Sequence, residues 1–238
     1  MAQGFFRHIP NIVYDFKSDG QFYQAKDLFR KVSTWSYLQE GVSGYSYYRI
    51  TDGERPDVVA ARLYGDSTLY WTFFLVNENL QDFNDWPKGS QYFNRYLNRK
   101  YSGKCLVASS STDIVSSTSK FNLGEKVSQS SSGAYGFVTD VNPTHNRITV
   151  NSISGEFTTG TISGEDKSCS ITSIQNEKDA VNHYTDSNGF KTTVSTGNTV
   201  VTNEQHELNL NEDKFQIRYI EPRYIGKVIR EFIEIVRD

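Results

Sequence analysis

Two pairs of carboxylates are the first residues in this sequence whose type and spacing could support chemistry. Asp82 and Asp85 stand three positions apart, and so do Glu54 and Asp57. Glycoside hydrolysis needs two carboxyl groups held at a set separation across a cleft. A spacing of three in a loop or at a helix start is too common to indicate that chemistry, and helix capping explains it better. The sequence therefore predicts a protein that is not an enzyme.

Histidine and cysteine patterns do not indicate metal or nucleophilic chemistry. The four histidines are widely scattered and none has the spacing of metal ligands: His8, His145, His183 and His206. Cys105 could be a nucleophile, but no surrounding motif supports that role. Cys105 and Cys169 are too few for a disulfide framework or a metal site, and the sequence contains no GxSxG, HExxH or phosphate-loop motif. We expect no metal, no cofactor and folding in a reducing cytoplasm.

Charge and composition also exclude several classes of partner. The chain has 238 residues and a net charge of −3, so no strong field favours nucleic acid or an anionic membrane. The segment 92–104 mixes aromatic residues with Arg95, Arg99, Lys100 and Lys104, a mixture that can mark nucleic-acid binding. A solvated helix face, or pairing with an acidic neighbour, fits the rest of the chain better. No apolar run approaches the ~20 residues of a membrane span, and the N-terminus lacks the apolar stretch of a secretory signal.

The elements that must position these residues centre on the segment LYGDSTLYWTFFLVNEN, which runs from Leu63 to Asn79. Before it, Pro56 favours the first turn of a helix and Gly65 favours its end. Asp66 or Ser67 can then cap a second helix from about Thr68 to Val76. Because that second helix is apolar almost all round, it belongs in a core or in an interface.

Other periodicities complete the expected elements. Alternation predicts strands over 11–16, 45–50 and 214–220, and helical spacing predicts helices over 25–38 and 86–101. Residues 180–206 are polar, with a hairpin expected around the pair Asn188-Gly189, which favours a type I′ turn. After Pro222, a terminal helix carries one apolar stripe: Ile225, Val228, Ile229, Phe232, Ile233 and Val236.

The composition changes at Gly103, which indicates an insertion. Residues 108–120 and 128–133 are rich in serine and threonine, and short β-runs separated by glycines fill residues 121–174. This pattern predicts a small β-barrel or sandwich. We therefore expect an α+β chain with an N-terminal region over 1–104, an inserted barrel over 105–175, and a return to the core domain over 176–238. Within the first part, a strand-helix-helix unit is expected over about 45–100.

The sequence YYRITDGERPDVVAARLYGDSTLYWTFFLVNEN, residues 47–79, resembles a LysM domain, which is a βααβ module. Together with Trp86 and Ser90, it resembles the LysM-like baseplate wedge proteins of T4-type contractile-tailed bacteriophages. The resemblance covers residues 20–100 well and 205–238 loosely. Residues 105–175 depart from the pattern of that family and look like an inserted β-barrel.

The resemblance implies a virion structural protein that joins neighbouring wedges into the hexameric tail baseplate. Its partners would be other baseplate wedge proteins, with six copies per baseplate and assembly in the host cytoplasm. The apolar helix would then be covered partly by its own strands and partly by other subunits. The residues expected to bind partners are aromatic or lie on the terminal stripe: Tyr70, Trp71, Phe73, Phe74, Trp86, Ile225, Ile229 and Phe232.

Two other interpretations stay open. The aromatic residues of the second helix could be plain core. Alternatively, the unit could bind a cell-wall glycan such as peptidoglycan, because the loop NENLQDFNDW offers polar groups at Asn77, Asn79, Asp82 and Asn84. The absence of a recognisable closing strand directly after Asn79 counts against glycan binding. The ligand of the insert, and whether Cys105 lies near Cys169, are not indicated by the sequence.

Overall fold

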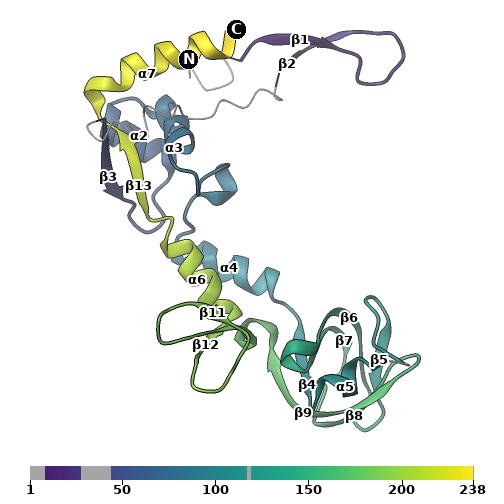
Figure 1. Cartoon of the computed structure of the whole chain (residues 1–238). Helices are drawn as coiled ribbons and strands as arrows, with labels where there is room; N and C mark the ends of the chain where they lie inside the picture. The colour runs from purple at the N-terminus through teal and green to yellow at the C-terminus, as the bar shows by residue number, and fades with distance from the viewer. Residues whose placement is uncertain (1–8, 28–43, 117–118, 238) are drawn as a thin grey trace. The chain divides into compact units, whose positions relative to one another are not determined.

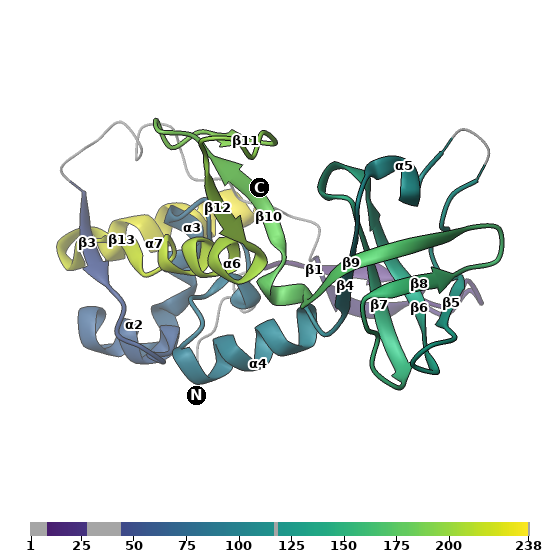
Figure 2. The same cartoon turned by 90° about the horizontal axis from the view of Figure 1, so that it is seen from below.

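The computed structural model describes residues 9–27, 44–116 and 119–237, except the side chains of residues 153, 236 and 237. The chain mixes helices and strands and forms two compact units (Figures 1 and 2). One unit contains the chain up to Ser90 and from Asn211 onward, and the other contains Gln91–Leu210. The expected α+β class and the expected barrel are both confirmed.

A two-stranded antiparallel sheet closes the first unit. It consists of β3 (Tyr45–Arg49) and β13 (Gln216–Ile220), with Tyr47 opposite Arg218. Between the two strands in sequence come α2 (Pro56–Tyr64), the 3₁₀ turn η2 (Ser67–Tyr70) and α3 (Trp71–Val76). The strand that closes the unit therefore comes from the far end of the chain, which is why none is recognisable directly after Asn79.

The start and stop signals of the first helix are confirmed. Pro56 begins α2, and Gly65 ends it in the left-handed conformation at φ 73°, with its N–H donating to Ala61 O at 3.0 Å. The continuous second helix expected from Thr68 to Val76 is wrong in its first turn, which is the 3₁₀ turn η2. The Asp66 carboxylate accepts both the N–H and the hydroxyl of Thr68, at 2.8 and 2.7 Å, and so favours a tight turn before α3.

The chain itself covers the apolar helix α3. Phe73 is fully buried in a core shared by α2, β13 and the following loop: Ile50, Val59, Ala60, Leu80, Trp86, Phe215 and Ile217. Trp71 packs on Phe232 of α7 (Pro222–Arg237) with 4.6 Å between ring centroids. Val76 lies in a third cluster with Ile220 and Val228. The apolar stripe of α7 therefore covers the side of α3 that carries Trp71 and Val76, while Phe74 stays half-buried.

The first unit also contains a hairpin that precedes β3 in the chain. β1 (Asn11–Tyr14) pairs antiparallel with β2 (Tyr23–Lys26), which confirms the strand expected near residue 11. The helix expected over 25–38 is wrong at residues 25 and 26, which belong to β2, and its part beyond residue 27 lies outside the described residues. The Asp15 carboxylate organises the turn because it accepts the N–H groups of Lys17, Asp19 and Gly20.

The second unit contains a closed six-stranded barrel. Its strands follow the order β4-β7-β6-β5-β8-β9, and their bounds are β4 (Lys104–Ala108), β5 (Lys126–Gln129), β6 (Ala134–Asn142), β7 (Arg147–Ser154), β8 (Gly160–Ser163) and β9 (Ser168–Asn176). Fully buried apolar residues fill the interior, including Leu106, Val127, Ile148 and Ile162. The short helix α5 (Ser111–Ile114) packs on this core through Ile114. Closure leaves the barrel without strand edges.

A three-stranded sheet of order β11-β10-β12 follows the barrel. Its strands are β10 (Val181–Thr185), β11 (Lys191–Thr192) and β12 (Thr199–Thr202). The expected hairpin is present, but the two-residue type I′ turn at Asn188-Gly189 is wrong, because Thr185 pairs with Lys191 across a longer loop. The Asp186 carboxylate shapes that loop, since it accepts the N–H groups of Asn188 and Phe190 at 2.9 and 2.8 Å.

Two more helices lie in the described residues. They are α4 (Ser90–Lys100), expected from residue 86, and α6 (Asn203–Glu212), which the sequence did not indicate. The buried face of α6 is polar, with Asn203, Glu207 and Asn211 inside and Leu208 and Leu210 exposed. Helical apolar periodicity therefore could not reveal it.

Glu207 links α6 to α4 and to the residue after α4 through three hydrogen bonds. Its carboxylate accepts from Tyr96 Oη at 2.8 Å, Lys100 Nζ at 2.7 Å and Tyr101 Oη at 2.9 Å. Burial alone would raise the pKa of Glu207, but the hydrogen bonds from Lys100 and the two tyrosines outweigh it and hold the pKa below its usual value. Lys100 of α4 thus pairs with an acidic residue of the same chain, as one alternative for the 92–104 segment expected.

We expect Glu207→Ala to lower the free energy of unfolding at pH 7 by about 1.5–3 kcal/mol, the range for hydrogen bonds to charged groups. Because the folded pKa lies below the unfolded one, the stabilisation is present above the unfolded pKa and is lost as pH falls through the folded pKa. Denaturant unfolding at several pH values measures this, and the wild type should approach the variant in acid. Glu204→Ala on the same helix is the control, since its 3.7 Å pair with Lys178 is half-exposed. An equal loss in both variants would contradict the assignment.

We expect the barrel to be removable, because its two ends meet. Glu177 N–H donates to Gly103 O at 3.0 Å, and Gly103 N–H donates to the Glu177 carboxylate at 2.8 Å. Replacing residues 104–176 by a Gly-Gly bridge should leave the remainder folded, since short bridges between adjacent ends cost little chain entropy. Amide exchange in α4, α6 and β3 measures the outcome. Loss of protection in β3 would show that the barrel is not an autonomous insert.

Candidate partner-binding surface

The structure divides the residues expected to bind partners into two groups. Trp71, Phe73, Trp86 and Phe232 are 0–8% exposed and pack inside the first unit. The indole N–H of Trp86 also donates to Glu54 O at 2.8 Å. The other four are half-buried and so can still touch another molecule: Tyr70, Phe74, Ile225 and Ile229. Partner binding stays a prediction, and of the eight expected residues these four are exposed enough to take part in it.

Phe83 is a surface residue that the sequence reasoning missed. It is 58% exposed, and its ring centroid lies 5.2 Å from that of Tyr70 and 5.1 Å from that of Phe74. We call Tyr70, Phe74 and Phe83 the aromatic patch. The signal in the sequence was a lone phenylalanine in the polar loop NENLQDFNDW. Contiguous exposed aromatic side chains are typical of protein interfaces.

The four carboxylates considered for catalysis serve the fold. Asp82 and Asp85 form a capping box around the 3₁₀ turn η3 (Phe83–Asp85), which presents Phe83. Burial would raise the pKa of Asp85, but the hydrogen bonds from Lys214, at 2.9 Å, and from backbone N–H groups lower it. Glu54 lies 2.7 Å from Arg62, and Asp57 lies 3.1 Å from Arg55.

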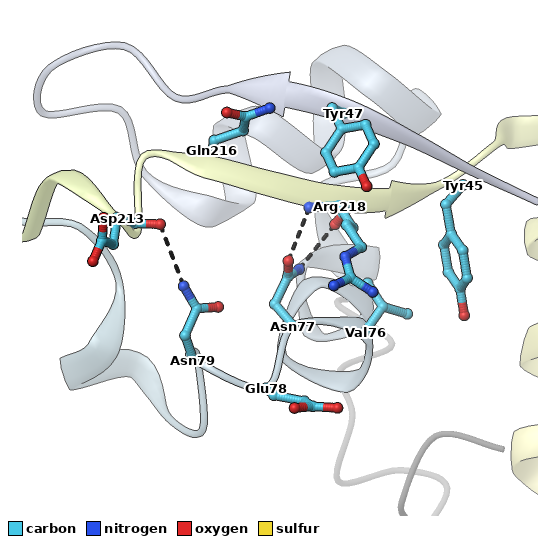
Figure 3. Close-up of a pocket in the computed structure, with 9 residues that line it drawn as sticks. All are labelled: Tyr45, Tyr47, Val76, Asn77, Glu78, Asn79, Asp213, Gln216 and Arg218. Atoms are coloured by element: carbon cyan, nitrogen blue, oxygen red, sulfur yellow. Dashed lines mark hydrogen bonds between the residues drawn. The ribbon is translucent and has the colours of Figure 1, made fainter. Parts of the chain in front are cut away.

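A shallow hollow of about 400 Å³ lies beside β13 in the first unit (Figure 3). Its lining is mostly polar or aromatic: Tyr45, Tyr47, Val76, Asn77, Glu78, Asn79, Asp213, Gln216 and Arg218. Tyr45 and Tyr47 belong to one face of β3, opposite Ile220 and Arg218 of β13. Tyr47 is 65% exposed. Tyr45 is partly buried, and this burial raises the pKa of its hydroxyl. The hollow therefore offers a tyrosine face and charged rims rather than an apolar groove.

Asn77 holds the strand beside this hollow. Its side-chain amide donates to Arg218 O at 2.9 Å and to Phe73 O at 2.8 Å, and its oxygen accepts from Arg218 N–H at 2.8 Å. Asn79 reaches Asp213 O at 3.4 Å, and Asp82 caps η3. Three of the four polar residues considered for glycan binding are thus engaged within the chain.

Two of the histidines that the sequence separates widely are in contact, while His8 lies outside the described residues. The rings of His183 and His206 meet edge to face at 5.4 Å, and that of His145 lies 5.9 Å from Tyr184. Burial first, then Lys191 and His206, lower the pKa of His183. Among the described residues, no group of three or more His, Cys, Asp or Glu side chains is placed to hold a metal ion.

Both cysteines are buried free thiols and lie apart in the barrel. Cys105 pairs with Thr149 and Gln175 in register, while Cys169 lies at the other end of β9, opposite Ile162. Burial raises the pKa of both thiols, that of Cys169 to about 11. Protonated, buried thiols are poor nucleophiles.

Within residues 9–27, 44–116 and 119–237, no helix is long and apolar enough to span a membrane.

Residues 2–104 match the model of a phage family described as Base plate wedge protein 53. The matched segment covers less than half of the chain; it contains β3, α2, α3, the aromatic patch and α4, and it ends where the barrel begins. No curated protein matches the chain. The match supports a structural role in a phage tail baseplate.

We expect Asn77→Ala to lower the free energy of unfolding by about 1–3 kcal/mol, because the backbone groups of Arg218 and the carbonyl of Phe73 would lose their hydrogen bonds to the Asn77 side chain. Thermal or denaturant unfolding of the full chain measures the loss. Asn79→Ala, two positions further along and exposed, should cost less than about 0.5 kcal/mol. Equal stability of the two variants would show that Asn77 does not hold β13.

Proposed function

We propose that the chain is a baseplate wedge subunit of a contractile phage tail and joins neighbouring wedges into the hexameric baseplate through protein-protein contacts. The observation that carries the proposal is the match of residues 2–104 to the family described as Base plate wedge protein 53. On this proposal six copies assemble per baseplate in the host cytoplasm, without nucleic acid, membrane or cofactor. The mechanism is burial of complementary surface, not catalysis.

The aromatic patch supports a role in protein contacts. Its three side chains are partly exposed, and Phe83 lies on a capped turn whose carboxylates are already used within the fold. Aromatic side chains supply large contact areas with little loss of side-chain entropy, and they are enriched in interface hot spots. The half-buried residues Ile225 and Ile229 on α7 add apolar contact area on the same unit.

The order of elements supports a LysM-like first unit. β3, α2, α3 and β13 follow one another as strand, helix, helix and strand, and the two strands pair antiparallel. This chain departs from a compact βααβ module because Gln91–Leu210 form a second unit between α3 and β13.

A second candidate is the glycan-binding module. The exposed Tyr47 beside polar side chains in the hollow favours it, since sugars stack on tyrosine and bond to polar groups. Against it, Asn77 and Asp82 are engaged internally, and the loop before α2 is covered by the chain itself through Trp86 and Ser90. A pull-down on purified peptidoglycan separates the two candidates, because only the glycan-binding module should be retained. A separate test concerns catalysis: clearing of a peptidoglycan suspension by the pure chain would contradict the expectation that it is not an enzyme.

We expect single alanine substitutions in the first unit to separate core from contact residues. Phe73→Ala should cost about 3–5 kcal/mol of stability, because Phe73 is fully buried. Phe83→Ala should keep the melting temperature within a few degrees of the wild type and weaken co-purification with the wedge subunits of the same virion, because an interface truncation costs about 2 kcal/mol in binding.

Both quantities are measured on the same set of variants: Tyr70→Ala, Trp71→Ala, Phe73→Ala, Phe74→Ala and Phe83→Ala. If every variant that fails to assemble is also unfolded, the aromatic patch is ordinary core. The contact surface would then lie elsewhere, with Ile225 and Ile229 on α7 the next residues to test.

A further inference from the structure

The two outer edges of the sheet β3-β13 differ in how their backbone groups are satisfied. Edge strands present unpaired N–H and C=O groups, which bind other strands unless they are blocked. The outer edge of β13 is blocked at Arg218, where the Asn77 amide both accepts from its N–H and donates to its C=O. Figure 3 shows Asn77 reaching β13 from the side opposite β3. The side chain thus stands where a further strand would otherwise pair.

The direction of each backbone group of β3 follows from the bonds at the two ends of the sheet. Ile50 N–H donates to Phe215 O at 2.8 Å, and Gly44 O accepts from Glu221 N–H at 3.0 Å. In an antiparallel pair, residues that point toward the partner alternate with residues that point away. The backbone N–H and C=O groups of Ser46 and Tyr48 therefore point to β13. Those of Tyr45, Tyr47 and Arg49 point outward, away from β13.

These outward groups have no hydrogen-bond partner among the described residues. Within the described part of the chain, the sheet has two strands, and β3 pairs only with β13, over five residues in unbroken register. Of the devices that commonly protect an edge, β3 has a short length and a charged residue at its end, Arg49, but it has no proline, no lysine and no bulge. Its tyrosines instead favour an extended conformation.

We propose that the outer edge of β3 binds an extended segment of a neighbouring baseplate subunit by strand addition. The choice of a baseplate subunit rests on the proposed function. The outward N–H and C=O groups of Tyr45, Tyr47 and Arg49 select an extended backbone with the same two-residue repeat.

Side chains on the outer face narrow the chemistry of the added strand. Tyr45 and Tyr47 lie on that face and favour aromatic or β-branched residues opposite them. Arg49, whose side chain is 73% exposed and 3.6 Å from Glu212, favours an acidic residue beside it. The partner strand is therefore expected to alternate, with apolar residues near the tyrosines and a carboxylate at the end next to Arg49.

The register supplies a matched pair of proline variants. Tyr47→Pro removes one outward N–H and keeps every bond to β13, and proline is tolerated on edge strands when its nitrogen faces away from the partner. Tyr48→Pro removes an inward N–H and should unfold the unit. Tyr47→Ala removes the side chain and keeps the N–H, which separates backbone pairing from tyrosine contacts.

The test uses the full chain co-expressed with the wedge subunits of the same virion, and measures co-purification, melting temperature and residue-level amide exchange. The expected result is that Tyr47→Pro stays folded and binds at least tenfold more weakly, while Tyr47→Ala binds more tightly than Tyr47→Pro. In the wild-type complex, the amides of Tyr47 and Arg49 should exchange at least tenfold more slowly than in the free chain.

The outcomes separate this inference from the proposed function. If the wild type co-purifies and Tyr47→Pro binds equally well, strand addition is overturned and the wedge assignment stands. If the wild type does not bind the wedge subunits, the proposed function fails. If Tyr47→Pro unfolds, amide exchange in the wild-type complex decides, and unchanged rates at Tyr47 and Arg49 overturn the proposal. Self-association of the free chain that Tyr47→Pro abolishes would assign the edge to a second copy and overturn the choice of partner.

Discussion

The antiparallel pairing of β3 with β13 is the interaction on which the first unit depends. Ile217, fully buried on β13, completes the core around Phe73, and the same strand leads directly into α7, whose apolar stripe covers the rest of α3. Without that pairing, α3 would expose apolar side chains on several sides. The whole second unit, Gln91–Leu210, lies between β3 and β13 in the sequence. The two strands can still pair at little extra cost, because the entropy lost on closing a loop grows only logarithmically with its length.

Buried polar groups give the chain its specific long-range connections. Asn77 satisfies two backbone groups of β13, and Asn211 both accepts from Lys88 N–H and donates to Lys88 O. Glu207 accepts three hydrogen bonds from α4 and the residue after it. Each of these side chains would be costly to bury without its partner, so only one arrangement of the strands and helices satisfies them all. Apolar packing alone would tolerate more alternatives.

Local signals in the sequence predicted local structure well. Pro56 and Gly65 bound α2, the glycine-rich short runs after residue 121 form the barrel, and the stripe after Pro222 forms α7. Features set by distant partners were not predictable. α6 buries Asn203, Glu207 and Asn211, so its pattern is opposite to that of an amphipathic helix. The loop after β10 is shaped by the Asp186 carboxylate, which accepts two backbone N–H groups. The Asn-Gly pair in the same loop predicted a shorter turn instead.

The candidate surface also could not be located from the sequence alone. An apolar helix such as α3 indicates that something covers it, but periodicity cannot say whether the cover comes from the same chain or from a partner. Here α2, β13 and α7 supply it, and what remains for a partner lies at the periphery: Tyr70, Phe74, Phe83 and the outer edge of β3. On the proposed function, the unit would fold before it binds, because the fully buried residues that hold it together, such as Phe73 and Ile217, are not those that a neighbour would touch. A contact built on an already folded edge and a few ordered aromatic rings also loses little conformational entropy on binding, so that a small surface can still bind specifically.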